Sequence, residues 1–135
     1  MNPDIANLAP GQKWILKFSV SADEQEAFAL LSGDLNPIHL NQAFAEQAGF
    51  QRPVVYGGML IAKLSSIIGM YVPGSRGLWS GVKIDFRSPL LVDQEAKLEV
   101  ELIQFSEAVK SYVLNVLITC QGEIIASGKA MATLL

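Results

Sequence analysis

One helix-length segment, residues 59–71, is apolar on almost every face, and it limits the folds that this chain can adopt. A helix that is hydrophobic all round lies inside a protein core rather than on its surface. The segment therefore predicts a central helix that the rest of the chain must cover. Its apolar residues are Met59, Leu60, Ile61, Leu64, Ile67, Ile68 and Met70.

Most of the remaining chain alternates between apolar and polar residues, as β-strands with one buried face do. In residues 97–105, for example, Leu98, Val100 and Leu102 alternate with two glutamates. Long strands joined by short turns, together with one buried helix, favour an α+β fold with an antiparallel sheet wrapped around that helix. The expected strands are residues 12–20, 78–86, 97–105, 111–120 and 123–135.

Two shorter helices are expected before the central one. Ser21 followed by Glu24 forms a capping box, which starts a helix, and Gly33 is a typical residue at a helix end. Asn41 can cap a further short helix that extends to about residue 48. The apolar side of the first helix is expected to consist of Ala27, Phe28 and Leu31.

Length and composition indicate one globular domain, residues 1–135, with a substantial core. Half of the residues are hydrophobic and 17% are charged. So small a charged fraction leaves little polar surface for a lone monomer, which predicts a homo-oligomer with one apolar face covered. The ten basic residues are scattered in a chain of net charge −3, so no nucleic acid is expected as a partner.

Cys120 is the only cysteine and His39 the only histidine, so neither a disulfide framework nor a metal cluster can be assembled. No metal and no cofactor are expected. Residues 1–10 contain Asp4 and no basic residue, unlike a signal peptide. Residues 54–72 are the most apolar stretch, but glycines and polar residues interrupt it, whereas a membrane span needs about 20 largely apolar residues. We therefore expect a cytoplasmic protein with no membrane segment.

The residues with the clearest chemical potential lie in the sequence SGDLNPIH, residues 32–39. Asp34 lies five positions before His39, and a rigid Asn-Pro step separates them. A carboxylate and an imidazole on a stiff loop can take a proton from water and return one elsewhere. Residue types alone favour a plainer interpretation, in which a helix ends at Gly33 and an Asn-Pro turn carries a surface histidine.

The whole string resembles a family signature. SGDLNPIHL, followed by Ala43 and Phe44, is similar to the signature of the (R)-specific enoyl-CoA hydratases, which belong to the MaoC-like dehydratases. This resemblance implies the hot-dog fold, an antiparallel sheet wrapped around a central helix, and usually a homodimer. It continues through residues 52–55, Gly57, residues 73–74 and residues 86–89.

The resemblance implies a hydro-lyase that interconverts trans-2-enoyl-CoA and (R)-3-hydroxyacyl-CoA. Asp34 and His39 would activate the water, and the backbone amide of Gly57 would polarise the thioester carbonyl. A helix N-terminus offers unpaired N–H groups for this purpose, and donors aimed at a developing oxyanion contribute about 3–4 kcal/mol. From the residues alone, Gly57 and Gly58 are equally well explained as a turn before a helix.

Four further residues are expected at the substrate. Asn36 is expected to shape the loop. Tyr56 stands where the family usually has histidine, and a phenol cannot shuttle protons at neutral pH. Gly58 replaces a bulkier apolar residue, which would loosen the start of the helix or widen the pocket. Ser65 matches a serine that lines the family's active site, although a serine in a buried helix often bonds to a carbonyl one turn earlier.

Several alternatives stay open. The same residues would serve a (3R)-hydroxyacyl-[acyl-carrier-protein] dehydratase, and the sequence does not distinguish CoA from acyl-carrier-protein thioesters. Hot-dog proteins also include thioesterases, which place their carboxylate elsewhere, and non-catalytic acyl-binding modules. The intact Asp34 and His39 argue against such a module, while Tyr56 leaves room for it. Arg52 and Arg87 could contact the phosphates of a carrier or be solvated surface charges.

Overall fold

The computed structural model describes residues 8–135, and the expectation of no signal peptide falls mostly on residues outside this range. Within the range, five strands, three α-helices and one 3₁₀ turn follow one another along the chain. Their bounds are β1 Lys13–Phe18, α1 Ala22–Ser32, the turn η2 Pro37–His39, α2 Gln42–Gln47, α3 Gly57–Met70, β2 Gly77–Phe86, β3 Ala96–Ser106, β4 Ser111–Cys120 and β5 Glu123–Leu134.

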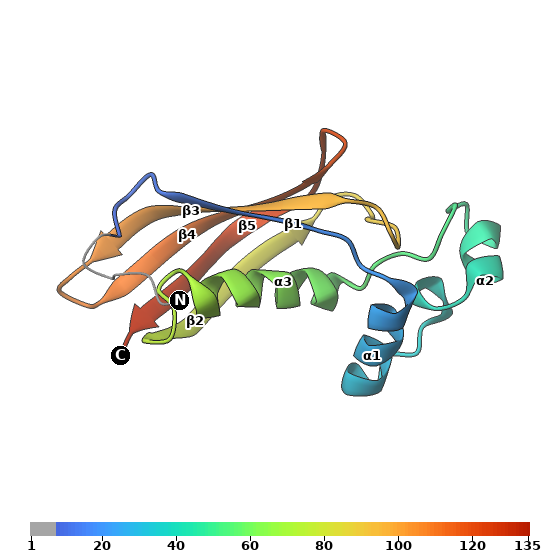
Figure 1. Cartoon of the computed structure of the whole chain (residues 1–135), viewed down its shortest axis with the longest axis horizontal. Helices are drawn as coiled ribbons and strands as arrows, with labels where there is room; N and C mark the ends of the chain where they lie inside the picture. Colours follow the sequence, from blue (N-terminus) through green and yellow to red (C-terminus); the bar gives the residue numbers. More distant parts are fainter. Residues whose placement is uncertain (1–7) are drawn as a thin grey trace.

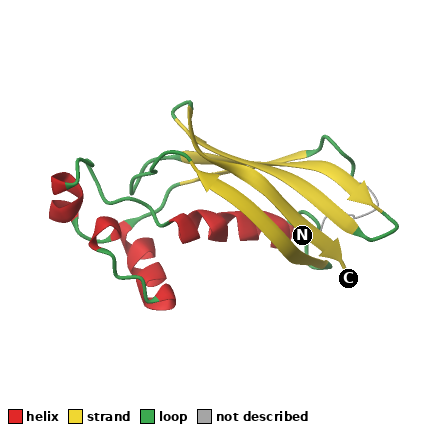
Figure 2. Cartoon of the chain, turned by 180° about the vertical axis from the view of Figure 1, so that it is seen from behind, coloured by secondary structure: helices red, strands yellow, loops and turns green. Residues whose placement is uncertain are grey.

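The five strands form one antiparallel sheet in the order β1-β3-β4-β5-β2. Helix α3 lies along one face of this sheet, whereas α1 and α2 both lie beyond the end at which α3 begins (Figure 1). The view from behind shows the same layers (Figure 2). This is the expected α+β architecture of an antiparallel sheet curved over one long helix.

One hydrophobic core joins the inner face of the sheet to α3. In β4 every second residue from Tyr112 to Cys120 is buried, as the alternation of the sequence predicts. From α3, Leu60, Leu64 and Ile67 are buried beside Ile68, because residues three or four positions apart share one side of a helix. The core therefore fixes the position of α3, and with it the position of the first turn of that helix.

The ranges predicted from the sequence agree with the structure to within two residues for every strand and for α3. For β4 the two ranges are the same, and α3 begins at Gly57, so the two glycines form its first turn. No helix within residues 8–135 is long and apolar enough to cross a membrane. The predicted single domain, residues 1–135, includes residues 1–7, which the structure does not describe, so its bounds stay a prediction.

The sheet covers α3 as predicted, but on one side only, so the expectation that a helix apolar on almost every face is buried all round does not hold for the single chain. Ala62, Ser65, Gly69 and Met70 are exposed on it, and Met70 retains 51% of its accessible surface. One sheet can cover only one side of a helix, and small residues occupy most of the opposite side. The fold thus leaves one side of α3 open.

The ends of α1 are as predicted. Ser21 Oγ accepts a hydrogen bond from the Glu24 N–H at 3.1 Å, and Glu24 Oε1 accepts one from the Ser21 N–H at 3.2 Å, which completes the capping box. Gly33 ends the helix with a left-handed φ of 77°, a conformation that favours glycine.

The buried side of α1 differs from the prediction. Ala27 and Leu31 are exposed, Leu31 to 84%, whereas Gln25 and Ala29 are buried. Of the three predicted contacts only Phe28 is partly buried. The reason is that α1 lies beyond the end of the sheet (Figure 1), so it packs on loops and on the start of α3 rather than on the core.

Candidate active site

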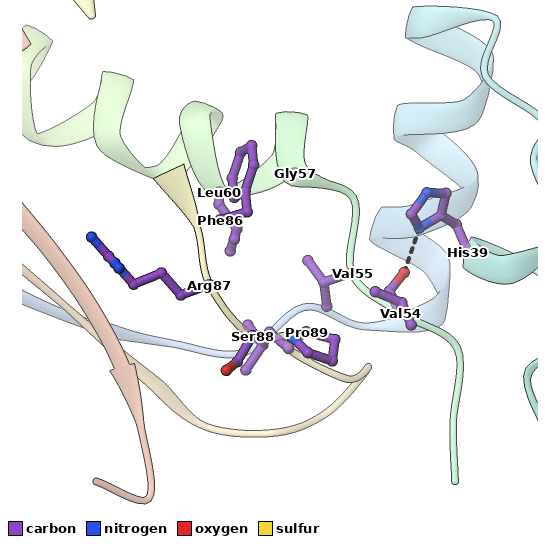
Figure 3. A pocket seen from close by; sticks show the side chains of 10 residues that line it. His39, Val54, Val55, Gly57, Leu60, Phe86, Arg87, Ser88 and Pro89 are labelled. Atoms are coloured by element: carbon purple, nitrogen blue, oxygen red, sulfur yellow. Dashed lines mark hydrogen bonds between the residues drawn. The ribbon is translucent and has the colours of Figure 1, made fainter. Parts of the chain in front are cut away.

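A cavity of about 320 Å³ lies where α3 begins, next to the end of β2. His39 and Gly57 both line it (Figure 3), one from the 3₁₀ turn and one from the first turn of α3. The structure thus brings the imidazole and the helix N-terminus to one space, although the two residues lie in different segments. The other lining residues are Val54, Val55, Leu60, Phe86, Arg87, Ser88, Pro89 and Leu90.

One short hydrogen bond orients the His39 ring. Its Nδ1 lies 2.6 Å from the carbonyl oxygen of Val54. A carbonyl oxygen can only accept, so Nδ1 carries the hydrogen and Nε2 presents a lone pair. Asn36 caps the 3₁₀ turn that ends at His39, and its Oδ1 accepts the Ile38 N–H at 3.2 Å, as the Asn-Pro sequence predicts. His39 is therefore able to accept a proton through Nε2.

Asp34 lies on the same loop but does not line the cavity, and its side chain is exposed. Its Oδ1 accepts the N–H of Asn36 at 3.0 Å, and its own N–H donates to Ser32 Oγ at 3.1 Å. These bonds fold the loop tightly after the end of α1. Among the described residues none donates to the other carboxylate oxygen, Oδ2, which is thus available to a ligand.

Tyr56 connects Asp34 to His39. Its ring stacks on the His39 ring, with centroids 4.0 Å apart and planes inclined by 26°. Its hydroxyl donates to the backbone carbonyl oxygen of Asp34 at 2.6 Å. Burial, and secondly the Asp34 carboxylate, raises the pKa of Tyr56, so the phenol stays a neutral donor. Tyr56 supports the loop and does not line the cavity.

Gln25 joins this loop to the start of α3, and sequence analysis does not single it out. Its side chain is 1% exposed. Its Nε2 donates to the carbonyl oxygens of His39 and Val54, both at 2.9 Å, and its Oε1 accepts the N–H of Tyr56 at 3.2 Å. A glutamine outside the predicted apolar side of a helix carries no sequence signal of burial, so the sequence does not predict this role.

Gly57 is the first residue of α3, and no side chain within residues 8–135 caps this helix end. The N–H groups of a first turn have no partner inside the helix, so they can bind an oxygen of a ligand. A β-carbon at Gly57 would lie 3.0 Å from the ζ carbon of Phe86, a residue that is 55% exposed. Phe86 lies beside Leu60 at this helix end (Figure 3), a position that no sequence pattern predicts.

Gly58 and Ser65 lie outside the cavity. A methyl group at Gly58 would overlap the ring of Phe28. Gly58 therefore does not widen the pocket, because Phe28 fills the space that the missing side chain leaves. A looser start of the helix stays a prediction. Ser65 is exposed on α3. Of the residues expected at the substrate, the structure thus brings His39 and Gly57 to the cavity.

Comparisons with known proteins extend these observations. A model of the MaoC like domain matches residues 7–118. The (R)-specific enoyl-CoA hydratase of Aeromonas caviae is 36% identical over 129 residues, which are 95% of this chain and 96% of that protein. The 3-hydroxybutyryl-CoA dehydratase of Methylorubrum extorquens is 26% identical over 125 residues, which are 93% of this chain and 80% of that protein.

Solved structures show the same architecture. An (R)-hydratase from Aeromonas caviae involved in PHA biosynthesis matches with a TM-score of 0.91 at 35% identity, covering 96% of this chain and 98% of that one. An unliganded R-hydratase from Pseudomonas aeruginosa gives a TM-score of 0.91 at 26% identity, covering 98% and 86%. These matches confirm the predicted hot-dog fold, and the chain belongs to the MaoC-like domain family.

Proposed function

We propose that this protein is a hydro-lyase that reversibly hydrates trans-2-enoyl-CoA to (R)-3-hydroxyacyl-CoA. The observation that carries the proposal is the shared cavity of His39 and Gly57. It combines a proton acceptor with the free N–H groups of a helix end, two of the functions that addition of water to an enoyl thioester requires. The similarity to the hydratase of Aeromonas caviae supports the same assignment.

The reaction adds the two parts of a water molecule across the C2–C3 double bond. His39 Nε2 and the Asp34 carboxylate hold the water and take one proton from it, and the hydroxyl oxygen forms a bond to C3. Negative charge moves to the thioester oxygen, where the Gly57 N–H stabilises it. The acid–base pair then returns a proton to C2, and the reverse sequence expels water.

The direct test follows the loss of the enoyl absorbance of crotonyl-CoA with wild-type protein and with Asp34→Asn and His39→Gln. We expect each substitution to lower kcat by about 10²- to 10⁴-fold, as removal of a positioned acid or base does. Chiral chromatography of the hydrolysed product should show (R)-3-hydroxybutyrate.

The matched control is Asp23→Asn, which makes the same change at an exposed position in the first turn of α1. Its kcat should equal that of the wild type. Full activity of Asp34→Asn and His39→Gln would refute the assigned mechanism.

The same assay distinguishes the alternative functions. Wild-type protein that binds crotonyl-CoA without turnover would support a non-catalytic acyl-binding module, and release of free CoA would support a thioesterase. A (3R)-hydroxyacyl-[acyl-carrier-protein] dehydratase would prefer the protein-bound thioester.

We also propose that two copies pair along the edge of β2. Strand β2 contacts only β5 in the sheet, and its Val82 and Phe86 remain 46% and 55% exposed. An uncovered strand edge with apolar residues favours pairing with another strand. The β1 edge is shorter, with 6 residues against 10 in β2, and offers less backbone for pairing. For the cellular location, the cytoplasm stays a prediction.

A further inference from the structure

A second cavity, of about 560 Å³, lies on the face of the sheet opposite α3. Three cationic residues line it: Lys83 of β2, Arg87 just after β2, and Lys129 of β5. Lys83 and Lys129 are direct partners in the antiparallel register. The neighbouring position on β5, Ala130, is fully buried, so Lys129 belongs to the outer face.

These three cations have no carboxylate partner within 4.0 Å among residues 8–135. Lys13, on the same face of the sheet, differs, since its Nζ lies 3.6 Å from a Glu101 oxygen. Asp85 is the only carboxylate among the residues that line the cavity. The cavity thus carries an excess of positive charge in a protein whose net charge is −3, and such a field attracts anions.

Arg87 belongs to both cavities. In Figure 3 its side chain extends away from Val55 and His39, and its Nε donates to Ser127 Oγ of β5 at 2.8 Å. The residue therefore reaches from the cavity of His39 and Gly57 to the cationic cavity. A long ligand whose one end lies in the cavity of His39 and Gly57 can pass Arg87 and place its other end in the cationic cavity.

The rest of the second lining suits an aromatic ring. Val113 and Met131 provide apolar surface beside the lysine pair, Leu117 adds apolar surface beside Ser127, and Asn115 adds an amide. The volume lies in the range of small-molecule sites, which is about 300–1,000 Å³. A concave site of this kind fits a nucleotide better than the broad surface of a protein carrier.

We propose that the outer cavity binds the phosphorylated adenosine end of a CoA thioester whose acyl end lies between His39 and Gly57. This inference rests on the proposed function and names CoA, rather than an acyl carrier protein, as the carrier. The guanidinium of Arg87 offers paired donors to a phosphate, and the two lysines supply point charges for the remaining anionic oxygens. The apolar lining beside the lysine pair, Val113 and Met131, holds the adenine.

The test compares two substrates with the same reacting group. Crotonyl-CoA carries the phosphorylated adenosine, and crotonyl-pantetheine lacks it. We expect the double variant Lys83→Ala/Lys129→Ala to raise KM for crotonyl-CoA by about 5- to 30-fold, as loss of two partly exposed ion pairs does. Its kcat should stay the same. Both parameters for crotonyl-pantetheine should equal those of the wild type.

A second opposed lysine pair gives the matched control. Lys17 of β1 and Lys97 of β3 face each other on the same side of the sheet but do not line the cationic cavity. The double variant Lys17→Ala/Lys97→Ala makes the same change in net charge. It should alter KM for crotonyl-CoA less than about twofold, since exposed charges beyond a Debye length are screened.

Three results for the variant Lys83→Ala/Lys129→Ala would overturn the inference. The first is an unchanged KM for crotonyl-CoA, and the second is an equal rise in KM for crotonyl-pantetheine. The third is a rise in KM that occurs only with a crotonyl-acyl-carrier-protein substrate. Calorimetric titration with free CoA and with pantetheine adds a readout that needs no turnover. Wild-type protein without hydratase activity would refute the proposed function, while weaker binding of CoA alone in the lysine variant would still support this site.

Discussion

The carboxamide of Gln25 joins segments that are far apart in the sequence, because one of its hydrogen bonds reaches Val54, 29 residues away. Val54 in turn accepts the Nδ1–H of His39, and the N–H of Tyr56, the residue before Gly57, donates to Gln25. The position of the His39 ring relative to the helix end therefore depends on one buried amide. At the residue scale, Gln25 is a positioning residue of the site.

Replacing Gln25 with leucine keeps the size of the side chain and removes its three hydrogen bonds. We expect the free energy of unfolding to fall by about 2–4 kcal/mol, because buried backbone groups lose their partners. The kcat for crotonyl-CoA should fall as well, since His39 loses its fixed orientation. Urea denaturation and steady-state kinetics measure the two effects.

Gln47→Leu is the control for this prediction, since Gln47 is an exposed residue of α2. An exposed substitution of this kind changes the free energy of unfolding by no more than about 0.5 kcal/mol. If Gln25→Leu were as stable and as active as Gln47→Leu, Gln25 would have no positioning role.

At the scale of the elements, the sequence predicts local features well and contacts between elements poorly. The capping box at Ser21 and the alternation in β4 depend on neighbouring residues, and both are confirmed. The packing of Phe28 on Gly58 and the burial of Gln25 depend on where α1 lies relative to α3. No periodicity in the sequence determines that placement.

The contact between α1 and α3 can be tested by Gly58→Ala. Alanine normally stabilises a helix relative to glycine, by up to about 1 kcal/mol. Here its methyl group overlaps the Phe28 ring, so we expect a loss of about 1–3 kcal/mol in the free energy of unfolding. Adding Phe28→Leu should recover part of this loss. Strictly additive effects in a double-mutant cycle would contradict the contact.

The start of α1 predicts a dependence of stability on pH. The Ser21 N–H bond, and then Lys63, lowers the pKa of Glu24 below its ordinary value despite partial burial. A lowered pKa contributes stability above the ordinary value of about 4.3, and this stability is lost as the pH falls through the lowered pKa. Glu24→Gln removes the ionised group at every pH.

The difference in the free energy of unfolding between wild type and Glu24→Gln should therefore be larger at pH 7 than at about pH 3. Urea denaturation at both pH values measures it, and the acid effects of all other groups cancel in the difference. A difference in the free energy of unfolding that stays constant or grows toward low pH would contradict the assigned role of Glu24.

At the scale of the whole molecule, the motif and the alternation of the sequence predict the family and the hot-dog fold, and both are confirmed. The roles of Asp34, His39 and Gly57 stay predictions. The sequence could not show that one side of α3 stays open, nor that three dispersed cations gather at one cavity. Both depend on how distant strands pair.

The open edge of β2 predicts the state of association. Wild-type protein should have twice the mass of the chain in size-exclusion chromatography with light scattering. Val82→Glu places a charge on the apolar part of that edge and should shift the protein toward monomer at equal concentration. Val109→Glu, at a residue that is 68% exposed between β3 and β4, should remain a dimer. A monomeric wild type would contradict the proposed pairing.

The most direct measurement is a crystal structure with (R)-3-hydroxybutyryl-CoA. We expect the 3-hydroxyl oxygen to lie within about 3 Å of both His39 Nε2 and an oxygen of the Asp34 carboxylate, at hydrogen-bonding distance. We also expect the thioester oxygen to accept the Gly57 N–H. An acyl group bound away from these residues, or a carboxylate turned away from the hydroxyl, would contradict the proposed mechanism.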